Sequence, residues 1–374
     1  MADRCAKRST SLWREAERRR AQSRFQEALA LYRQAEQAFR REKEEEGVLS
    51  CRLAKGHCLR LLGRFRQALG EYQAAGRLAQ EEGEEMAVAD ALVGEGMAWR
   101  ALGNFSAALH CFDQAIQHYE QEGDRVGLAY TLWAKGGALR VQGELLDAVE
   151  LFERAFHLFE QAEEPSGAAY ALCALGGVSR VMGRFADSLR YYTEAHQRFH
   201  SLADRFGLAY SYCGMGNARR MLQEYETALA LYARARHLYQ KIGDRVSYAY
   251  TLWGEGTAYK MLGRYREAKQ DFQEAARLFQ ATQDHRGRVY TLLGQGEILA
   301  LSGKGAQATR KLQQALQLAQ AGGYRLETLH ALLCWTLLQK GEGETGALQE
   351  ILDRYAELGT SFLPHPPAFP LNLP

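Results

Sequence analysis

The pattern of apolar and polar positions along the chain predicts pairs of α-helices. Residues 144–161, ELLDAVELFERAFHLFEQ, carry apolar side chains three or four positions apart, at Leu146, Val149, Phe152, Phe156 and Phe159. The preceding stretch, DRVGLAYTLWAKGGALRVQ at 124–142, also lacks proline, which would break a helix. Gly143 lies between the two stretches and tolerates the positive φ of a tight turn. We therefore expect a helix, a short turn and a second helix.

This unit recurs along the chain. GDRVGLAYTLW at 123–133 returns as GDRVSYAYTLW at 243–253, which is 120 residues later. Two series of glycines show that the true period is 40 residues: Gly63, Gly103, Gly143, Gly183, Gly263 and Gly303 in the turns, and Gly56, Gly96, Gly136, Gly176, Gly216, Gly256 and Gly296 in the first helices. A fixed period in this range is typical of a solenoid, in which each unit packs only on its neighbours.

The second helix of each unit repeats a pattern of aromatic and small residues. An aromatic residue follows the turn glycine by two positions, at Phe65, Phe105, Phe185, Tyr225 and Tyr265. Further along come Tyr72, Phe112, Phe152, Tyr192, Tyr232 and Phe272, each followed three positions later by alanine. We expect this stripe to be core, with aspartates at the unit boundaries, such as Asp124, Asp204 and Asp284, as helix N-caps.

The motif glycine-x-aromatic-x-x-alanine, with a helix glycine seven residues before it, resembles the tetratricopeptide repeat, and the 40-residue length resembles the variety in partner-of-inscuteable adaptors and many bacterial regulatory proteins. Gln223 and Ser23 depart from the turn glycine, and Leu145 departs from the aromatic. The resemblance implies an all-α, right-handed superhelical solenoid of about eight helix-turn-helix units with a C-terminal capping helix. It also implies a concave groove lined by the first helices.

We predict four regions along the chain. Residues 1–8 form an N-terminal tail, and 9–323 form eight repeats that start near 9, 47, 87, 127, 167, 207, 247 and 287. Residues 324–359 form capping helices, because the ends of a stack must be closed against water. Residues 360–374 contain five of the six prolines and form an apolar tail. We expect this tail to dock, either on the terminal helices around Leu332 and Trp335 or on a partner.

Composition limits the classes of function. The net charge of +2 does not favour bulk attraction to nucleic acid or membrane. Seven scattered cysteines fit reduced thiols in a cytoplasmic protein, and the N-terminal residues show no apolar signal segment. No apolar run approaches the ~20 residues of a membrane span. The oligomeric state stays open.

No motif in the sequence calls for catalysis. The glycine pairs in GEGMA, GMGN and GQGE lie within helices and follow no strand, so they do not predict a phosphate loop. Cys51, His57 and Cys58 lack a second ligand pair, so we expect buried thiols and no metal site. No acid–base pair or triad recurs at a plausible spacing. We therefore predict a protein that is not an enzyme and needs no cofactor.

One face of the first helices carries the candidate site. Residues at offsets of 0, 3, 7 and 10 from a recurring tyrosine lie within about 80° of one another on a helix. That face carries tyrosines, tryptophans, small residues and a row of cations. The predicted partner-binding residues are Arg60, Arg100, Tyr130, Trp133, Arg140, Tyr170, Arg180, Tyr210, Asn217, Arg220, Tyr250, Trp253, Lys260 and Tyr290.

These residues also have a structural interpretation. A cation in the last turn of a helix complements the helix dipole, and the tyrosines could bridge neighbouring helices. The leading functional hypothesis is a non-catalytic adaptor that holds a protein or peptide with acidic and apolar groups. The second is a regulatory sensor that closes around a short peptide or small molecule. Nucleic-acid binding through the arginines is a weaker third hypothesis.

Overall fold

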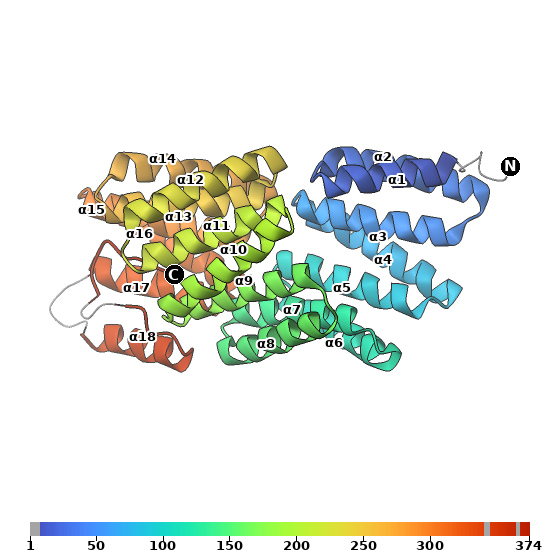
Figure 1. The fold of residues 1–374 in the computed structure, drawn as a ribbon. Helices are drawn as coiled ribbons and strands as arrows, with labels where there is room; N and C mark the ends of the chain where they lie inside the picture. Colours follow the sequence, from blue (N-terminus) through green and yellow to red (C-terminus); the bar gives the residue numbers. More distant parts are fainter. Residues whose placement is uncertain (1–7, 340–344, 364–366) are drawn as a thin grey trace. The chain divides into compact units, whose positions relative to one another are not determined.

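The computed structural model describes residues 8–339, 345–363 and 367–374. Across these residues the regular secondary structure consists of 18 α-helices, shown in Figure 1. The fold is all-α, as the pattern predicted. Within the same ranges, no helix combines the length and the apolar character needed to cross a bilayer.

The chain divides into two compact units, one of residues 1–135 with 242–244 and one of residues 136–241 with 245–374. Unit 1 contains α1 (Arg8–Ala21), α2 (Phe25–Glu42), α3 (Glu45–Leu61), α4 (Phe65–Glu82), α5 (Glu85–Ala101), α6 (Phe105–Glu122) and the first part of α7 (Arg125–Gln142). Unit 2 contains the rest of α7 and then α8 (Leu145–Gln161), α9 (Pro165–Val181), α10 (Phe185–Ser201), α11 (Arg205–Met221), α12 (Tyr225–Ile242), α13 (Arg245–Met261), α14 (Tyr265–Thr282), α15 (His285–Leu301), α16 (Gly305–Ala321), α17 (Arg325–Gln339) and α18 (Thr345–Glu357).

Turn and cap residues fall where the sequence predicted them. The turn residue Gly143 has a φ of 88°, and Gln223, which replaces glycine at the same place, has a φ of 65°. Asp204 and Asp284 accept hydrogen bonds from backbone N–H groups in the first turns of α11 and α15, at 3.0 and 2.8 Å. These contacts satisfy donors that the start of a helix leaves without a partner.

Aromatic rings of the second helices pack directly on glycines of the first helices. The ring of Tyr72 in α4 lies so close to Gly56 of α3 that an added Cβ would be 2.7 Å from it. The same ring also covers Gly94 of α5, the first helix of the next repeat, where an added Cβ would overlap it. Phe112 covers Gly96 in the same way. The helix glycines therefore let one ring join two successive repeats at close range.

The buried face of α8 differs from the expectation. We expected Leu146 on the buried stripe, but its side chain is 68% exposed. The residues that are buried are Leu145, Ala148, Phe152, Ala155 and Phe159. The small alanines determine this rotation, because they allow close approach to neighbouring helices. Leu145 thus fills the place of the aromatic that the other repeats carry.

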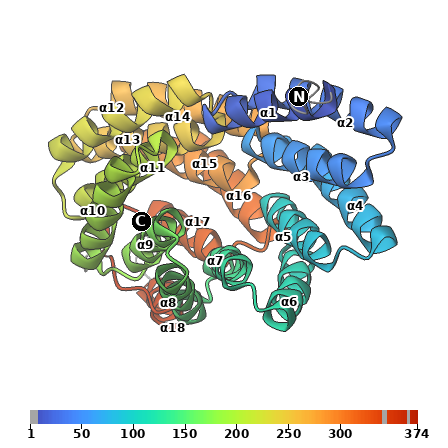
Figure 2. The same ribbon diagram turned by 45° about the vertical axis from the view of Figure 1, so that its right-hand side comes forward.

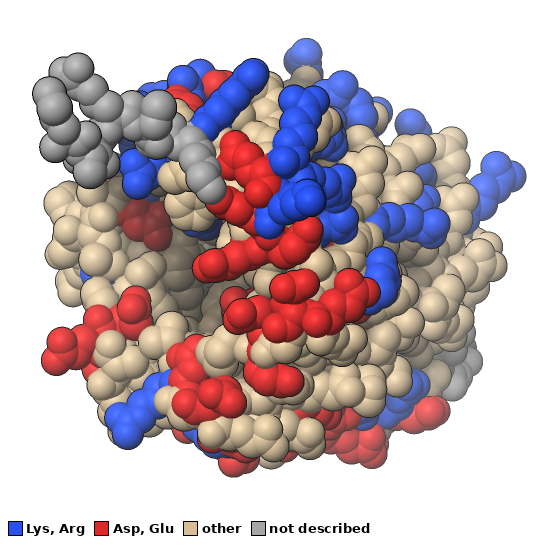
Figure 3. Space-filling model, turned by 90° about the vertical axis from the view of Figure 1, so that its right-hand side faces the viewer, with Lys and Arg blue, Asp and Glu red and all other residues tan. Residues whose placement is uncertain are grey.

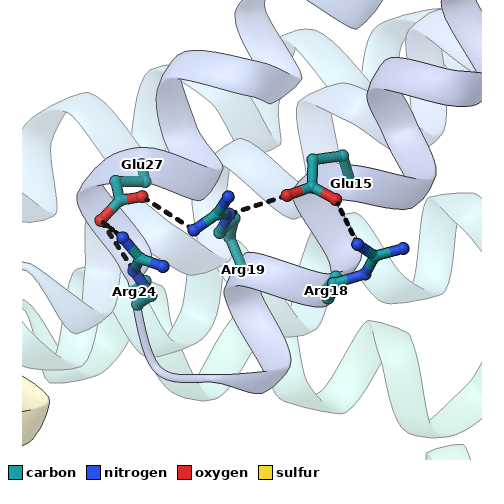
Figure 4. A network of polar contacts seen from close by, with 5 residues as sticks. All are labelled: Glu15, Arg18, Arg19, Arg24 and Glu27. Carbon is teal, nitrogen blue, oxygen red and sulfur yellow. Dashed lines mark hydrogen bonds and ion pairs between the residues drawn. The ribbon is translucent and has the colours of Figure 1, made fainter.

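The basic residues near the N-terminus are neutralised locally (Figure 4). Arg19 of α1 contacts Glu15 at 2.8 Å and Glu27 of α2 at 3.3 Å. Arg18 pairs with Glu15, and Arg24 pairs with Glu27. Such exposed pairs add little stability. They do show that this basic run is an internal network within the first helical pair.

Unit 2 ends in α17 and α18, which pack on one another through a buried histidine. Nδ1 of His330 lies 2.7 Å from the hydroxyl of Tyr355, and the ring of Phe362 stands edge-on to both rings. Burial lowers the pKa of His330 to about 4, with Glu327 acting in the opposite direction. The folded protein therefore holds this imidazole neutral.

We expect Gly94→Ala to lower the free energy of unfolding by about 1–3 kcal/mol, because the new methyl group overlaps the Tyr72 ring. Gly70→Ala in α4 is the matched control, since its added Cβ meets nothing within 4 Å. The control should gain up to about 1 kcal/mol from helix propensity. Thermal and urea unfolding of both variants provide the measurement. Equal effects at the two positions would contradict this packing.

We expect acid to destabilise unit 2 partly through His330. Its folded pKa lies below the unfolded value of 6.5, so the unfolded chain binds more protons as the pH falls through that window. The loss should reach about 2 kcal/mol at pH 5. His330→Gln cannot titrate and can still bond Tyr355. Its melting temperature should therefore fall less between pH 7 and pH 5, and an unchanged pH slope would refute the assignment.

Candidate functional site

The first helices of unit 2 form a continuous row. α9 packs on α11, α11 on α13, α13 on α15 and α15 on α17. Figure 2 shows α11, α13 and α15 on the side that faces α17, with α10, α12 and α14 outside them. Four basic residues, here called the cation row, occupy the same position in successive first helices: Arg140 in α7, Arg180 in α9, Arg220 in α11 and Lys260 in α13. All four belong to unit 2.

Residues 367–374, here called the C-terminal segment, cross this row. Nζ of Lys260 donates to the carbonyl of Leu371 at 2.8 Å and to Glu297 Oε1 at 2.7 Å. The N–H of Leu371 donates to Glu297 Oε2 at 2.8 Å. Both main-chain polar groups of one residue are therefore held by one lysine–glutamate pair.

Arg220 holds the next two residues. Its Nη2 donates to the carbonyl of Leu373 at 2.9 Å, and its Nη1 donates to Oδ1 of Asn372. In return, Nδ2 of Asn372 donates to the carbonyl of Arg220 at 2.8 Å. The guanidinium is fully buried and lies 5.3 Å from the centre of the Trp253 ring. The arginine thus binds one main-chain and one side-chain oxygen of the segment.

Apolar contacts complete the docking. Leu371 and Leu373 are 1% and 4% exposed. Together with first-helix side chains they line a small pocket, whose other walls are Trp253, Thr257, Lys260, Tyr290, Leu293, Gly294 and Glu297. Burying a leucine side chain is worth about 1.5–3 kcal/mol. We expected the tail to dock around Leu332 and Trp335, but the leucines that it buries lie instead on α13 and α15.

The Lys260–Glu297 pair is matched to a main chain. The two side chains are 2% and 1% exposed, and an ion pair so deeply buried is expensive unless its remaining polar atoms are satisfied. Here the second oxygen of the glutamate and the ammonium group both bond Leu371. An extended peptide supplies this donor and acceptor in any sequence, so the pair suits peptide recognition.

The predicted tyrosines mainly join repeats. The hydroxyl of Tyr170 donates to Asp204 at 2.8 Å, and that of Tyr290 donates to Glu327 at 2.8 Å. Tyr250 approaches Asp284 at 3.4 Å. Tyr210 packs against a cluster that includes Tyr192 and Met215. Each of the three hydroxyls reaches the first helix of the next repeat or its cap, and this geometry accords with the bridging interpretation.

Asn217 is held within its own repeat. Its Oδ1 accepts a hydrogen bond from the Tyr232 hydroxyl at 2.8 Å. This bond orients the side chain on α11. Trp253 is 7% exposed and forms part of the pocket wall beside Tyr290.

The remaining predicted residues belong to unit 1. Nη2 of Arg60 lies 3.3 Å from Nδ1 of His57, and Arg100 donates to the carbonyl of Ala134 at 3.1 Å. Tyr130 stacks on Trp133 with ring centres 5.5 Å apart. The C-terminal segment lies in unit 2, so the structure associates these four residues with other contacts than those described above.

Sequence reasoning missed Glu297 and the C-terminal segment as parts of the site. Glu297 occupies the position that holds Gly137, Gly177, Asn217 and Thr257 in the other repeats. An acidic residue one repeat after Lys260 was the available signal. The role of Asn372 had no signal, because it depends on where the segment docks.

The cysteines and histidines do not form a metal site in the described ranges. No group of three potential His, Cys, Asp or Glu ligands occurs there. Cys51 and Cys58 are buried thiols, and burial raises the pKa of each to about 12. Burial lowers the pKa of His57 to about 3, which keeps it neutral.

Comparison with known proteins identifies the repeat. A tetratricopeptide repeat model matches residues 167–241 and 207–281. No protein with a curated description matches the sequence. Among solved structures, a Rap protein complexed with competence and sporulation factor is similar, with a TM-score of 0.65 and 16% identity over 83% of this chain and 87% of that chain.

Two further structures show the same fold. The Rap conjugation gene regulator of plasmid pLS20, in complex with the Phr* peptide, has a TM-score of 0.61 and 14% identity over 94% of both chains. The apo form of RapI has a TM-score of 0.56 and 14% identity over 73% of this chain and 97% of that chain. Residues 167–281 are thus tetratricopeptide repeats, and the chain as described has the all-helical fold of the tetratricopeptide repeat superfamily.

Proposed function

We propose that the first-helix face of unit 2 is a binding site for an extended peptide. The observation that carries this proposal is the C-terminal segment itself, whose main chain bonds Lys260, Glu297 and Arg220. Tetratricopeptide arrays are non-enzymatic scaffolds for protein interaction. The chain would therefore act by holding a protein or peptide partner.

The comparisons support a peptide as the ligand class. Two of the similar structures contain bound factors, namely competence and sporulation factor and the Phr* peptide. The C-terminal segment uses the same kind of surface as a peptide would, because it contacts three successive first helices, α11, α13 and α15. Contacts along several repeats favour a groove over a single small-molecule pocket.

A second observation favours the regulatory sensor. The C-terminal end of unit 2 meets earlier turns of the same unit, because Arg325 pairs with Glu144 at 2.5 Å and Ser361 donates to the carbonyl of Met182 at 3.3 Å. An added Cβ at Gly183 would lie 2.5 Å from the carbonyl oxygen of Ser361. Occupancy of the groove is therefore coupled along one short chain, residues 361–374, to closure of unit 2.

Two features weigh against nucleic-acid binding. The basic run of α1 is paired with Glu15 and Glu27. Figure 3 shows a band of acidic side chains across the face that lies on the right of Figure 1, where α2 turns into α3 and α4 into α5. These turns carry Glu44–Glu46 and Glu82, Glu84 and Glu85. Such a face repels a polyanion.

The peptide proposal predicts competition between an added peptide and the C-terminal segment. We expect the synthetic peptide PAFPLNLP, the sequence of residues 367–374, to bind the full chain carrying Leu371→Ser and Leu373→Ser, here called the released-tail variant. Binding to the unchanged chain should be at least about tenfold weaker, because a tethered segment competes at a high effective concentration. Isothermal titration calorimetry measures both affinities.

The control peptide carries serine in place of both leucines and should bind neither chain. Circular dichroism of the released-tail variant establishes that it is folded. If the folded variant does not bind PAFPLNLP, the first-helix face is not a peptide site.

A further inference from the structure

The C-terminal segment has a defined direction along the cation row. Leu371 lies at Lys260 of α13, and Asn372 and Leu373 lie at Arg220 of α11. As the residue number rises, the segment therefore moves one repeat toward α9. Figures 1 and 2 both show the end of the chain close to α9 and α17. The next members of the row in this direction are Arg180 and Arg140.

Arg180 and Arg140 differ from the other members of the row in their contacts. Nε and Nη1 of Arg180 are buried and have no hydrogen-bond partner among the described residues. Arg140 makes no hydrogen bond or ion pair in the same ranges. Neither guanidinium stacks on an aromatic ring there, whereas Arg220 lies over Trp253. These two arginines therefore lack the contacts that explain buried cations elsewhere.

The surroundings of the two arginines carry a surplus of positive charge. Burial lowers the pKa of Arg140, and the nearby guanidinium groups of Arg286 and Arg180 lower it further. The one carboxylate bound by Arg286 is Glu327, which also accepts from Tyr290. Burial opposes the charge on Glu327, but Arg286 outweighs burial and the net pKa is lowered. Three guanidinium groups thus share one carboxylate.

The C-terminal segment does not neutralise this charge. Its residues, PAFPLNLP, include no Asp or Glu. Lys260 and Arg220 each bind an oxygen atom of the segment, so the occupied half of the row shows what the cations do with a peptide. The other half offers the same groups to whatever follows Leu373 in a longer ligand.

We propose that Arg180 and Arg140 form a carboxylate-binding subsite for a peptide that replaces the C-terminal segment. The ligand would be an extended peptide with two apolar residues flanking one polar residue, followed within about two residues by a carboxylate, since an extended chain spans ~3.3 Å per residue. The carboxylate can belong to an acidic side chain or to the end of the ligand. This inference rests on the proposed peptide site, which it extends.

The test compares peptides that differ in the residues after the docking sequence. We use PAFPLNLP followed by two glutamates, by two glutamines, or by two glutamines with a free terminal carboxylate, the first two being amidated at the C-terminus. All are titrated into the released-tail variant. A charge-assisted contact is worth about 1.5–3 kcal/mol, so the glutamate peptide should bind at least about tenfold tighter than the amidated glutamine peptide. Tight binding of the third peptide would identify a terminal carboxylate as a sufficient ligand.

Variants locate the effect. Arg180→Gln and Arg140→Gln, each made in the released-tail variant, should reduce the affinity of the glutamate peptide toward that of the amidated glutamine peptide and leave the latter unchanged. Arg310→Gln is the matched control, because Arg310 is exposed on α16 of the same unit. It should change neither affinity. Two independent arginine variants keep the test valid if one of them unfolds.

The outcomes separate the two proposals. If the glutamate and glutamine peptides bind equally well, the carboxylate subsite is refuted and the peptide site stands. If charge matters but Arg310→Gln reduces binding as much as the two site variants, the attraction is non-specific and the subsite is also refuted. If no peptide binds a folded released-tail variant, the proposed function itself fails.

Discussion

The structure depends on aromatic rings that pack against helix surfaces without a Cβ atom. Tyr192 of α10 contacts Gly176 of α9 and Gly214 of α11, and Tyr232 of α12 contacts Gly216 and Gly254 in the same manner. One ring thus joins its own repeat to the next. Any larger residue at the glycine would displace the ring, because a close-packed interior has no room to absorb a methyl group. The 40-residue period follows from this contact.

The same packing leaves space on the first-helix face. Gly294 admits the ring of Phe272 from one side and lines the pocket of Leu371 and Leu373 on the other. Glycines that are needed for stacking therefore also open the surface that the C-terminal segment covers. The bulk that fills this surface comes from residues 367–374 and not from the helices.

Charge determines how that surface is used. Lys260 and Glu297 are almost completely buried, and their hydrogen bonds to Leu371 offset part of the cost of removing them from water. Arg220 is in a similar position with Leu373 and Asn372. Arg180 has buried nitrogen atoms without such partners. Satisfied and unsatisfied cations thus follow one another along a single row, which is why the row suits a ligand longer than the C-terminal segment.

The sequence by itself determined the helices, their turns and their caps, because these depend on local properties. Helical spacing, the left-handed turn at Gly143 and the caps at Asp204 and Asp284 involve residues close in the chain. It also placed Arg220 and Lys260 on one face. Only the tertiary structure decided that Leu146 is exposed while Leu145 is buried, and that Leu371 meets Glu297 across 74 positions. Helix rotation and the docking of an irregular segment depend on packing and desolvation between distant residues, and no local pattern encodes them.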